Sequence, residues 1–232
     1  MIYNVNKSSG TTTGTSPLTW SHTCLSNDKV LVVGTGVPVG KATQTVTAVT
    51  YSGVSMTQIG TALDNVAGNL NISLWYLENP TVGANTVSVT FSDIQHTNGI
   101  ALSFPLASTY DTTATNTTNT TSISTSLTPT NSIGSFIVDV IGNAAIGATI
   151  ADNGRQVIIV PNVSVGIGGA VMSMSVAPQF VRETPIKFDY TLGGTGQDTA
   201  HRMASFAITN FSTPTVKNPV LRPAAFTPGF GR

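Results

Sequence analysis

Apolar and polar residues alternate along much of the chain with the period of two that is typical of β-strands. In residues 86–91, for example, Val87 and Val89 fall on one face and hydroxyl side chains occupy the other. The segments that alternate in this way, or that are rich in Thr, Val and Ile between turn residues, are 18–24, 29–35, 43–51, 55–61, 70–77, 86–91, 99–104, 121–128, 136–140, 156–160, 171–176, 187–192 and 203–209. Helical periodicity is almost absent. The pattern therefore predicts an all-β protein, an antiparallel β-sandwich of jelly-roll type.

Three segments depart from this pattern. Residues 1–17 are polar and end in Thr-Ser-Pro, which predicts an N-terminal arm. Residues 108–121 are of low complexity, mostly Thr and Asn, and predict a surface loop. Residues 212–232 carry four of the 12 prolines, which predicts an extended C-terminal tail. The Thr-rich loop could mark a domain boundary, but each half would then have few strands for a sandwich of its own. We therefore expect one sandwich domain over residues 18–211.

The composition limits the possible partners. Only 9% of the residues are charged, against roughly 25% in an ordinary soluble domain, and the 10 basic and 10 acidic residues cancel. Ser and Thr take their place, with 22 and 37 copies. Because the chain has no surplus positive charge, we expect it to bind neither nucleic acid nor a membrane. The single cysteine, Cys24, excludes an intrachain disulfide.

A glycine-rich segment superficially matches a dinucleotide-binding turn. Gly34, Gly36 and Gly40 follow an apolar strand, as in that motif. The motif also needs a helix whose N-terminus faces the phosphates. Here Pro38 and a second strand follow instead, and Ala42 stands where a phosphate-binding loop requires a hydroxyl. The sequence therefore favours a glycine-rich loop between two strands and predicts no cofactor.

Two Asp-x-x-His sequences are the main candidates for chemistry: Asp93 with His96, and Asp198 with His201. An Asp–His contact is one ingredient of a hydrolase triad or of a metal site. No third ligand stands at metal-site spacing, and no Gly-x-Ser-x-Gly nucleophile turn is present. We expect no catalytic residues and no metal, although metal binding by either pair stays open. Two acids distant in the sequence could also converge in a glycosidase or lyase cleft; this is the third and least favoured class.

The aromatic pair Trp75 and Tyr76 is the main candidate for ligand binding. As neighbours within strand 70–77 they point to opposite faces. One of them is expected in the core. The other is a candidate platform on which a sugar ring could stack.

Several segments resemble a jelly-roll module found in virion structural proteins of tailed bacteriophages and in some bacterial surface proteins. They are 49–60 (VTYSGVSMTQIG), 72–80 (ISLWYLENP) and 83–91 (GANTVSVTF). The ending 218–232 (NPVLRPAAFTPGFGR) resembles short Pro-, Phe- and Arg-containing tails that close phage structural proteins. The resemblance implies a virion component and gives no catalytic residue to carry over.

The low charge and the tail agree with an assembly role. An uncharged surface loses little hydration energy when another subunit buries it. The residues expected to anchor the tail on a neighbouring subunit are Arg222, Phe226, Pro228, Phe230 and Arg232.

We therefore expect a non-enzymatic structural component of the virion, a capsid decoration or cement protein. It would stabilise the shell through oligomerisation and terminal-arm contacts. Its partners would be further copies of itself and other virion proteins, above all the major capsid protein. The alternative is a carbohydrate-binding or adhesin module of a phage tail tip or a bacterial surface, which would bind surface glycans through Trp75 or Tyr76.

Overall fold

The computed structural model describes residues 5–38, 45–67, 70–92, 96–106, 108–130, 134–153, 156–164, 170–177, 185–196 and 198–209. About three quarters of these residues lie in β-strands and none lies in a helix, which confirms the all-β prediction. The described residues include no helix with the length and hydropathy that a membrane crossing requires. The strand pairings are antiparallel throughout.

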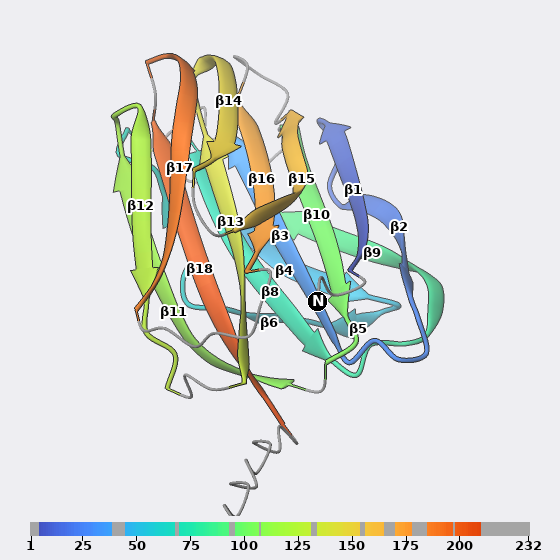
Figure 1. Cartoon of the computed structure of the whole chain (residues 1–232). Helices are drawn as coiled ribbons and strands as arrows, with labels where there is room; N and C mark the ends of the chain where they lie inside the picture. Colours follow the sequence, from blue (N-terminus) through green and yellow to red (C-terminus); the bar gives the residue numbers. More distant parts are fainter. Residues whose placement is uncertain are drawn as a thin grey trace, which may run out of the picture.

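The first half of the chain forms two sheets (Figure 1). The inner sheet has the strand order β1 (Asn6–Thr13), β10 (His96–Phe104), β3 (Val30–Pro38), β8 (Leu70–Glu78) and β6 (Thr57–Gln58), and β7 (Leu63–Asp64) also pairs with β8. The outer sheet has the order β2 (Leu18–Cys24), β9 (Gly83–Phe91), β4 (Val46–Tyr51) and β5 (Val54–Ser55). Apolar side chains from both sheets pack between them.

The second half repeats this arrangement. Its inner sheet has the order β11 (Ser108–Thr118), β18 (Thr199–Ile208), β13 (Ser135–Asn143), β16 (Val171–Val176) and β15 (Val157–Ser164). Its outer sheet has the order β12 (Ser122–Leu127), β17 (Ile186–Thr195) and β14 (Ile146–Asp152). The inner sheets correspond when β1, β3, β8 and β10 are matched to β11, β13, β16 and β18. The outer sheets correspond when β2, β4 and β9 are matched to β12, β14 and β17. The fold is thus an internal repeat of two sandwiches.

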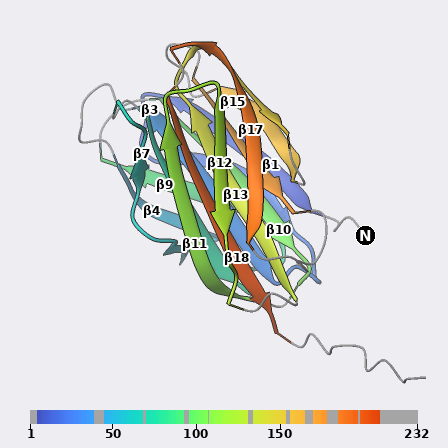
Figure 2. The same ribbon diagram turned by 60° about the vertical axis from the view of Figure 1, so that its left-hand side comes forward.

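A central hydrophobic cluster joins the two inner sheets. Phe136 of β13 contacts Phe104 of β10 and Phe206 of β18, with ring centroids 4.8 and 5.1 Å apart. Glycines let the sheets approach closely: a Cβ on Gly34 would lie 2.7 Å from the sulfur of Met174. The molecule therefore has four layers and three apolar cores. Figure 2 shows the layers from a second direction.

Several predictions are corrected by this architecture. The chain folds as two sandwiches that share a core, rather than as the one sandwich predicted over residues 18–211. Within the predicted arm 1–17, residues 6–13 form edge strand β1, which pairs with β10. Within the predicted loop 108–121, residues 108–118 form β11, which pairs with β18. Gly34 and Gly36 lie in strand β3 rather than in a loop. The predicted tail 212–232 lies outside the described residues.

Candidate functional site

The richest cluster of polar side chains lies inside the second sandwich and is centred on His201. Its acidic partner is Asp139 of the neighbouring strand β13, not Asp198 as the Asp-x-x-His spacing suggests. The Nε2 atom of His201 lies 2.7 Å from Oδ2 of Asp139, and Nδ1 lies 2.6 Å from Oγ1 of Thr125 on β12. Asp139 and His201 have no exposed surface, and Thr125 is 3% exposed. The cluster links the inner and outer sheets of this half.

The Asp139 carboxylate accepts further hydrogen bonds. The backbone N–H of Ser175 donates to Oδ1 at 2.7 Å, and the hydroxyl of Tyr190 donates to Oδ2. The Tyr190 hydroxyl also lies 2.8 Å from Oγ of Ser175. Burial raises the pKa of Tyr190 well above its usual value, and the negative charge of Asp139 is the second largest cause of this increase. Tyr190 therefore stays a neutral donor, and Asp139 is satisfied from three directions.

The order hydroxyl, imidazole and carboxylate is that of an acyl-transfer triad, with Thr125 in the place of the nucleophile. A catalytic nucleophile must reach a substrate, and Thr125 is closed in between two sheets. Its neighbours are apolar side chains such as Ile123 and Leu127 on the same strand face. We therefore interpret the cluster as a polar cross-link in the core, which fixes how the two sheets pack.

The first sandwich contains a second buried polar cluster. The Asp28 carboxylate accepts hydrogen bonds from the backbone N–H of Leu25 at 2.8 Å and from the hydroxyl of Ser103 at 2.6 Å. His22 lies 1% exposed, with Nδ1 2.8 Å from Oγ of Ser8. Burial lowers the pKa of His22 from 6.5 to about 4, although the charge of Asp28 acts in the opposite direction. His22 is therefore neutral at pH 7.

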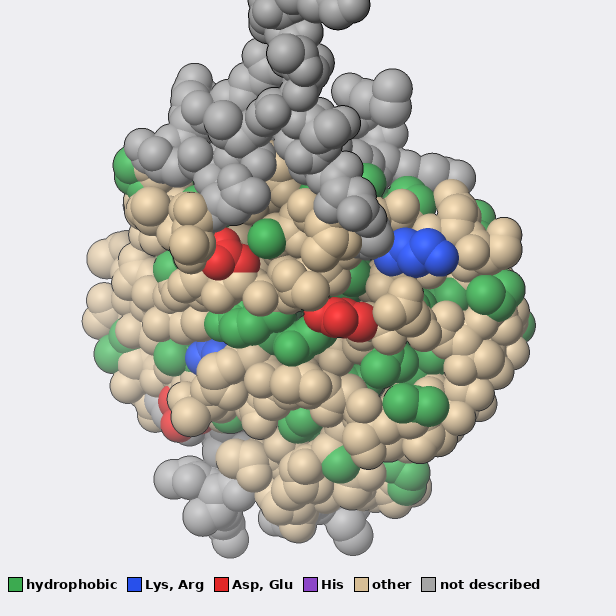
Figure 3. Space-filling view, turned by 90° about the horizontal axis from the view of Figure 1, so that it is seen from below, with side chains coloured by type: hydrophobic (Ala, Val, Ile, Leu, Met, Phe, Trp, Pro, Cys, Tyr) green, Lys and Arg blue, Asp and Glu red, His purple; other side chains and the backbone are tan. Residues whose placement is uncertain are grey.

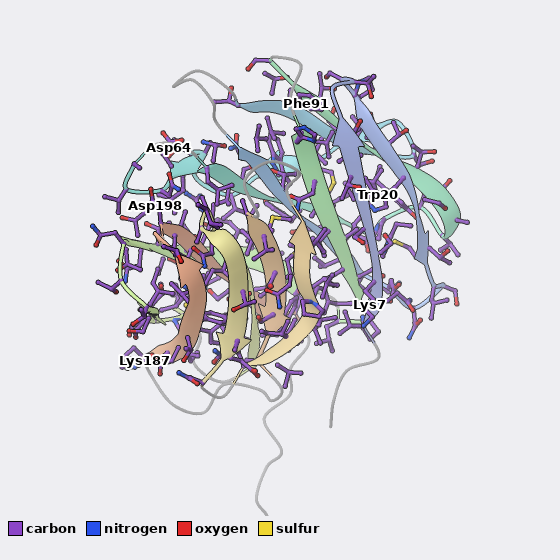
Figure 4. All side chains as sticks on the ribbon, turned by 90° about the horizontal axis from the view of Figure 1, so that it is seen from above. Lys7, Trp20, Asp64, Phe91, Lys187 and Asp198 are labelled. Atoms are coloured by element: carbon purple, nitrogen blue, oxygen red, sulfur yellow. The ribbon has the colours of Figure 1, made fainter. Side chains whose placement is uncertain are left out.

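Asp198 links the two halves of the chain instead of pairing with His201. Its two carboxylate oxygens accept hydrogen bonds from the backbone N–H groups of Val66 and Ala67, each at 2.8 Å. Figure 4 shows Asp198 on the same side of the molecule as Asp64. Of the other predicted pair, His96 begins strand β10, and Asp93 lies outside the described residues. Among the described residues, no group of three or more His, Cys, Asp or Glu side chains could hold a metal ion.

The structure places the two residues of the predicted aromatic pair on opposite faces of β8, with Trp75 as the core residue. Trp75 is 6% exposed, lies in the core of the first sandwich, and donates from Nε1 to Oγ of Ser73 at 2.7 Å. It therefore cannot serve as a surface platform. Tyr76 is half-buried and points the other way, toward the central cluster. Its ring stacks on that of Tyr110, with centroids 5.6 Å apart. Sequence reasoning missed Tyr110 because it lies in the segment predicted as a loop.

The outer faces of both sandwiches carry hydroxyl side chains at exposed or half-buried positions. On β2, β9 and β4 these are Thr19, Ser21, Thr23, Thr47, Thr50, Thr86, Ser88 and Thr90. On β12 and β17 they are Ser122, Ser124, Ser126 and Thr191. The strand register places Thr19, Ser88 and Thr50 side by side across the first outer sheet. The two outer sheets therefore present rows of hydroxyl side chains, which the second sheet interrupts with Lys187 and Asp189.

The described surface is less charged than the composition suggests. Of the twelve charged residues in the described ranges, four are buried, namely Asp28, Asp139, Asp198 and Arg202. Figure 3 shows one face on which single acidic and basic side chains are separated by uncharged ones. The predicted tail anchors Arg222, Phe226, Pro228, Phe230 and Arg232 lie outside the described residues. Comparison of the chain with protein-family models, curated proteins and solved structures finds no match.

Proposed function

We propose that the protein is a non-enzymatic structural component of a phage virion, a decoration protein that binds to a capsid surface. The observation that carries this proposal is the hydroxyl-covered outer sheet of the first sandwich, whose strands β2, β4 and β9 contain no charged residue. The second outer sheet carries Lys187 and Asp189 beside its serines, and these two side chains form an ion pair. Burying Ser and Thr against a partner loses far less hydration energy than burying Lys or Glu. Hydroxyl groups can also form hydrogen bonds with a neighbouring subunit or with trapped water.

The strand order supports a jelly-roll assignment for each half. In both halves the first and last strands pair on the inner sheet, as β1 with β10 and β11 with β18. In both halves the chain passes repeatedly between the inner and the outer sheet, so most strands that follow one another in the sequence lie in different sheets. We take this wound order as support for a jelly roll, an architecture common in viral capsid and lectin domains. It agrees with the resemblance of segments 49–60, 72–80 and 83–91.

The buried polar clusters support a non-enzymatic role. Asp139, His201 and Tyr190 make their hydrogen bonds with one another and with neighbouring strands. Their function in this proposal is to hold the sandwich rigid. A carbohydrate-binding role remains the second candidate, because Tyr76 and Tyr110 form a half-buried aromatic pair near the edge strand β11.

The assembly role is tested by incubating purified protein with purified particles and measuring how much sediments with them. We expect the full chain to sediment with particles and a chain that lacks residues 213–232 to remain in the supernatant. Both chains should give the same far-ultraviolet circular dichroism, because the last described strand, β18, ends at Ile208, before the deleted residues. A control chain whose tail is replaced by an uncharged Gly/Ser tail of equal length should behave as the deletion does. Full binding of the truncated chain would show that the tail is not the anchor, and failure of the full chain to bind would contradict the proposal.

A further inference from the structure

Strand β1 lies at the outer edge of the first inner sheet, where it pairs with β10 (Figure 1). None of its side chains from Asn6 to Thr12 is buried. Apolar contact at this end of the chain comes from Val5, which precedes the strand and packs half-buried against the central cluster. An edge strand with so little buried apolar surface opens more easily than the strands of a core.

Three side chains of neighbouring segments hold β1 through hydrogen bonds. Nδ2 of Asn6 donates to Oδ2 of Asp28 at 3.1 Å. Oγ of Ser8 lies 2.8 Å from Nδ1 of His22 and accepts a hydrogen bond from Nε1 of Trp20 at 2.9 Å. Trp20, His22 and Asp28 are therefore the anchor residues of β1.

The anchor residue His22 makes this arrangement sensitive to acid. Its side chain is 1% exposed, and its Nε2 atom is buried without a hydrogen-bond partner in the described structure. A neutral imidazole can leave Nε2 without a hydrogen, but a protonated ring carries a hydrogen on both nitrogens. Protonation therefore places an unpaired N–H and a positive charge in a site closed to water, which is unfavourable.

The titratable groups that the described residues place around His22 are Asp28, Cys24 and Tyr51. The Tyr51 ring packs edge-on against the imidazole, with ring centroids 6.2 Å apart. Burial raises the pKa of Tyr51 to about 12 and also raises the pKa of Cys24, so both groups stay neutral. Asp28 attracts a protonated His22, but burial has the larger effect on the pKa of His22. The basic side chain of β1, Lys7, donates to a backbone carbonyl of β15 instead.

The edge of β10 and the anchor residues together select the sequence of β1. The Trp20 ring lies against Gly10, where a Cβ would be 2.9 Å from atoms of the ring. The other two anchor residues accept an amide and a hydroxyl two positions apart, as Asn6 and Ser8 are. A second copy of the chain carries this same Asn-x-Ser-x-Gly pattern in its own β1.

We propose that β1 is a releasable strand: protonation of His22 frees β1 from β10, and the vacated edge of β10 accepts β1 of a second copy. Departure of β1 removes Ser8 from His22 and opens the imidazole to water. The pKa of His22 then returns from about 4 to 6.5, so release becomes more favourable as the pH falls below 6.5. For a full return, the equilibrium constant for release rises about 20-fold between pH 7 and pH 5. The proposal does not depend on the virion role.

The release step is tested by hydrogen exchange of the full chain at pH 7 and pH 5, read by mass spectrometry and corrected for the intrinsic effect of pH. We expect the protection of β1 and of residues 97–103 on β10 to fall about 20-fold at pH 5, while the central strand β13 keeps its protection. Equal protection of β1 at the two pH values would overturn the proposal.

Two variants assign the effect to one histidine. His22→Asn cannot take up a proton and should show the same protection of β1 at both pH values. His96→Asn is the matched control, because it replaces the histidine that pairs with Thr13 at the other end of β1, and it should keep the acid response. An acid response that survives in His22→Asn would contradict the proposal. Should His22→Asn fail to fold, strand exchange tests the proposal on the unmodified chain.

The exchange step is tested by adding an excess of a fluorescein-labelled peptide of residues 5–15 to the full chain. After mixing at pH 5, return to pH 7 and gel filtration, we expect the peptide to elute with the chain. The same peptide with Gly10→Val should not be retained, because its side chain would meet the Trp20 ring. Without peptide, the same treatment at high protein concentration should give a dimer that persists at pH 7. Loss of the unmodified peptide, equal retention of the two peptides, or absence of the dimer would each overturn the exchange.

Discussion

Replacing Asp139 by Ala should strongly destabilise the protein, because three buried donors lose their acceptor. These are the backbone N–H of Ser175, the hydroxyl of Tyr190 and the imidazole of His201. Each buried donor left unpaired costs about 1–3 kcal/mol. The Tyr190 hydroxyl keeps Ser175 as a partner, so the Ser175 N–H and the His201 imidazole carry most of the cost. We expect a loss of about 3–5 kcal/mol, a large part of the roughly 5–15 kcal/mol that stabilises a typical domain.

The assay is urea unfolding at pH 7, followed by tryptophan fluorescence and analysed by linear extrapolation. Asp139→Asn should lose less free energy, because the amide oxygen can still accept the N–H of Ser175. Glu78→Ala removes an exposed acid and serves as the control, with an expected change within about 0.5 kcal/mol. A loss below about 1 kcal/mol for Asp139→Ala would refute the conclusion that this carboxylate holds the second sandwich together.

Three further predictions follow from the cores. The folded state lowers the pKa of His22 from 6.5 to about 4, so it favours the neutral imidazole. The neutral imidazole therefore contributes fully to the free energy of unfolding above pH 6.5. This contribution is lost as the pH falls toward 4. The loss should reach about 3 kcal/mol, and His22→Asn should remove this part of the pH dependence measured by urea unfolding. Phe206→Ala should cost about 3–5 kcal/mol in the same assay, because it empties the centre of the aromatic cluster. Gly99→Ala should shift the tryptophan fluorescence to the red, since its Cβ would lie 2.4 Å from the Trp20 ring and expel it. An unchanged spectrum would contradict this packing.

The sequence pattern located most strands, and the reason is visible in the cores. Segments 18–24 and 171–176 coincide with β2 and β16, because buried residues recur at every second position, as Met172, Met174 and Val176 do in the central cluster. Edge strands β1 and β11 were not predicted. Both are mostly Ser, Thr and Asn, so they lack the apolar stripe that marks a buried face. Threonine favours strands, and a neighbouring strand was enough to order them.

The internal repeat was not predicted, because β11 lacks an apolar stripe and its segment was predicted as a loop. Once β11 is counted as a strand, the second half has enough strands for its own two sheets. The sequences of equivalent strands share little beyond Ser103-Phe104 and Ser205-Phe206, because many different apolar side chains can fill a core position.

The partner of His201 could not be predicted from spacing. Asp198 lies three residues away along the chain, but side chains three positions apart in an extended chain point to opposite sides. Asp198 instead accepts hydrogen bonds from backbone N–H groups of the first half. Asp139 lies 62 residues away along the chain and meets His201 only through the pairing of β13 with β18. Tyr110 and Arg202 likewise come together through tertiary structure alone.

The assembly role is tested most directly by quantitative mass spectrometry of purified particles from cells that produce the protein. We predict that the chain is present at a fixed copy number relative to the major capsid protein. Particles that contain none of it, purified from cells in which the folded protein is abundant, would contradict the proposed function.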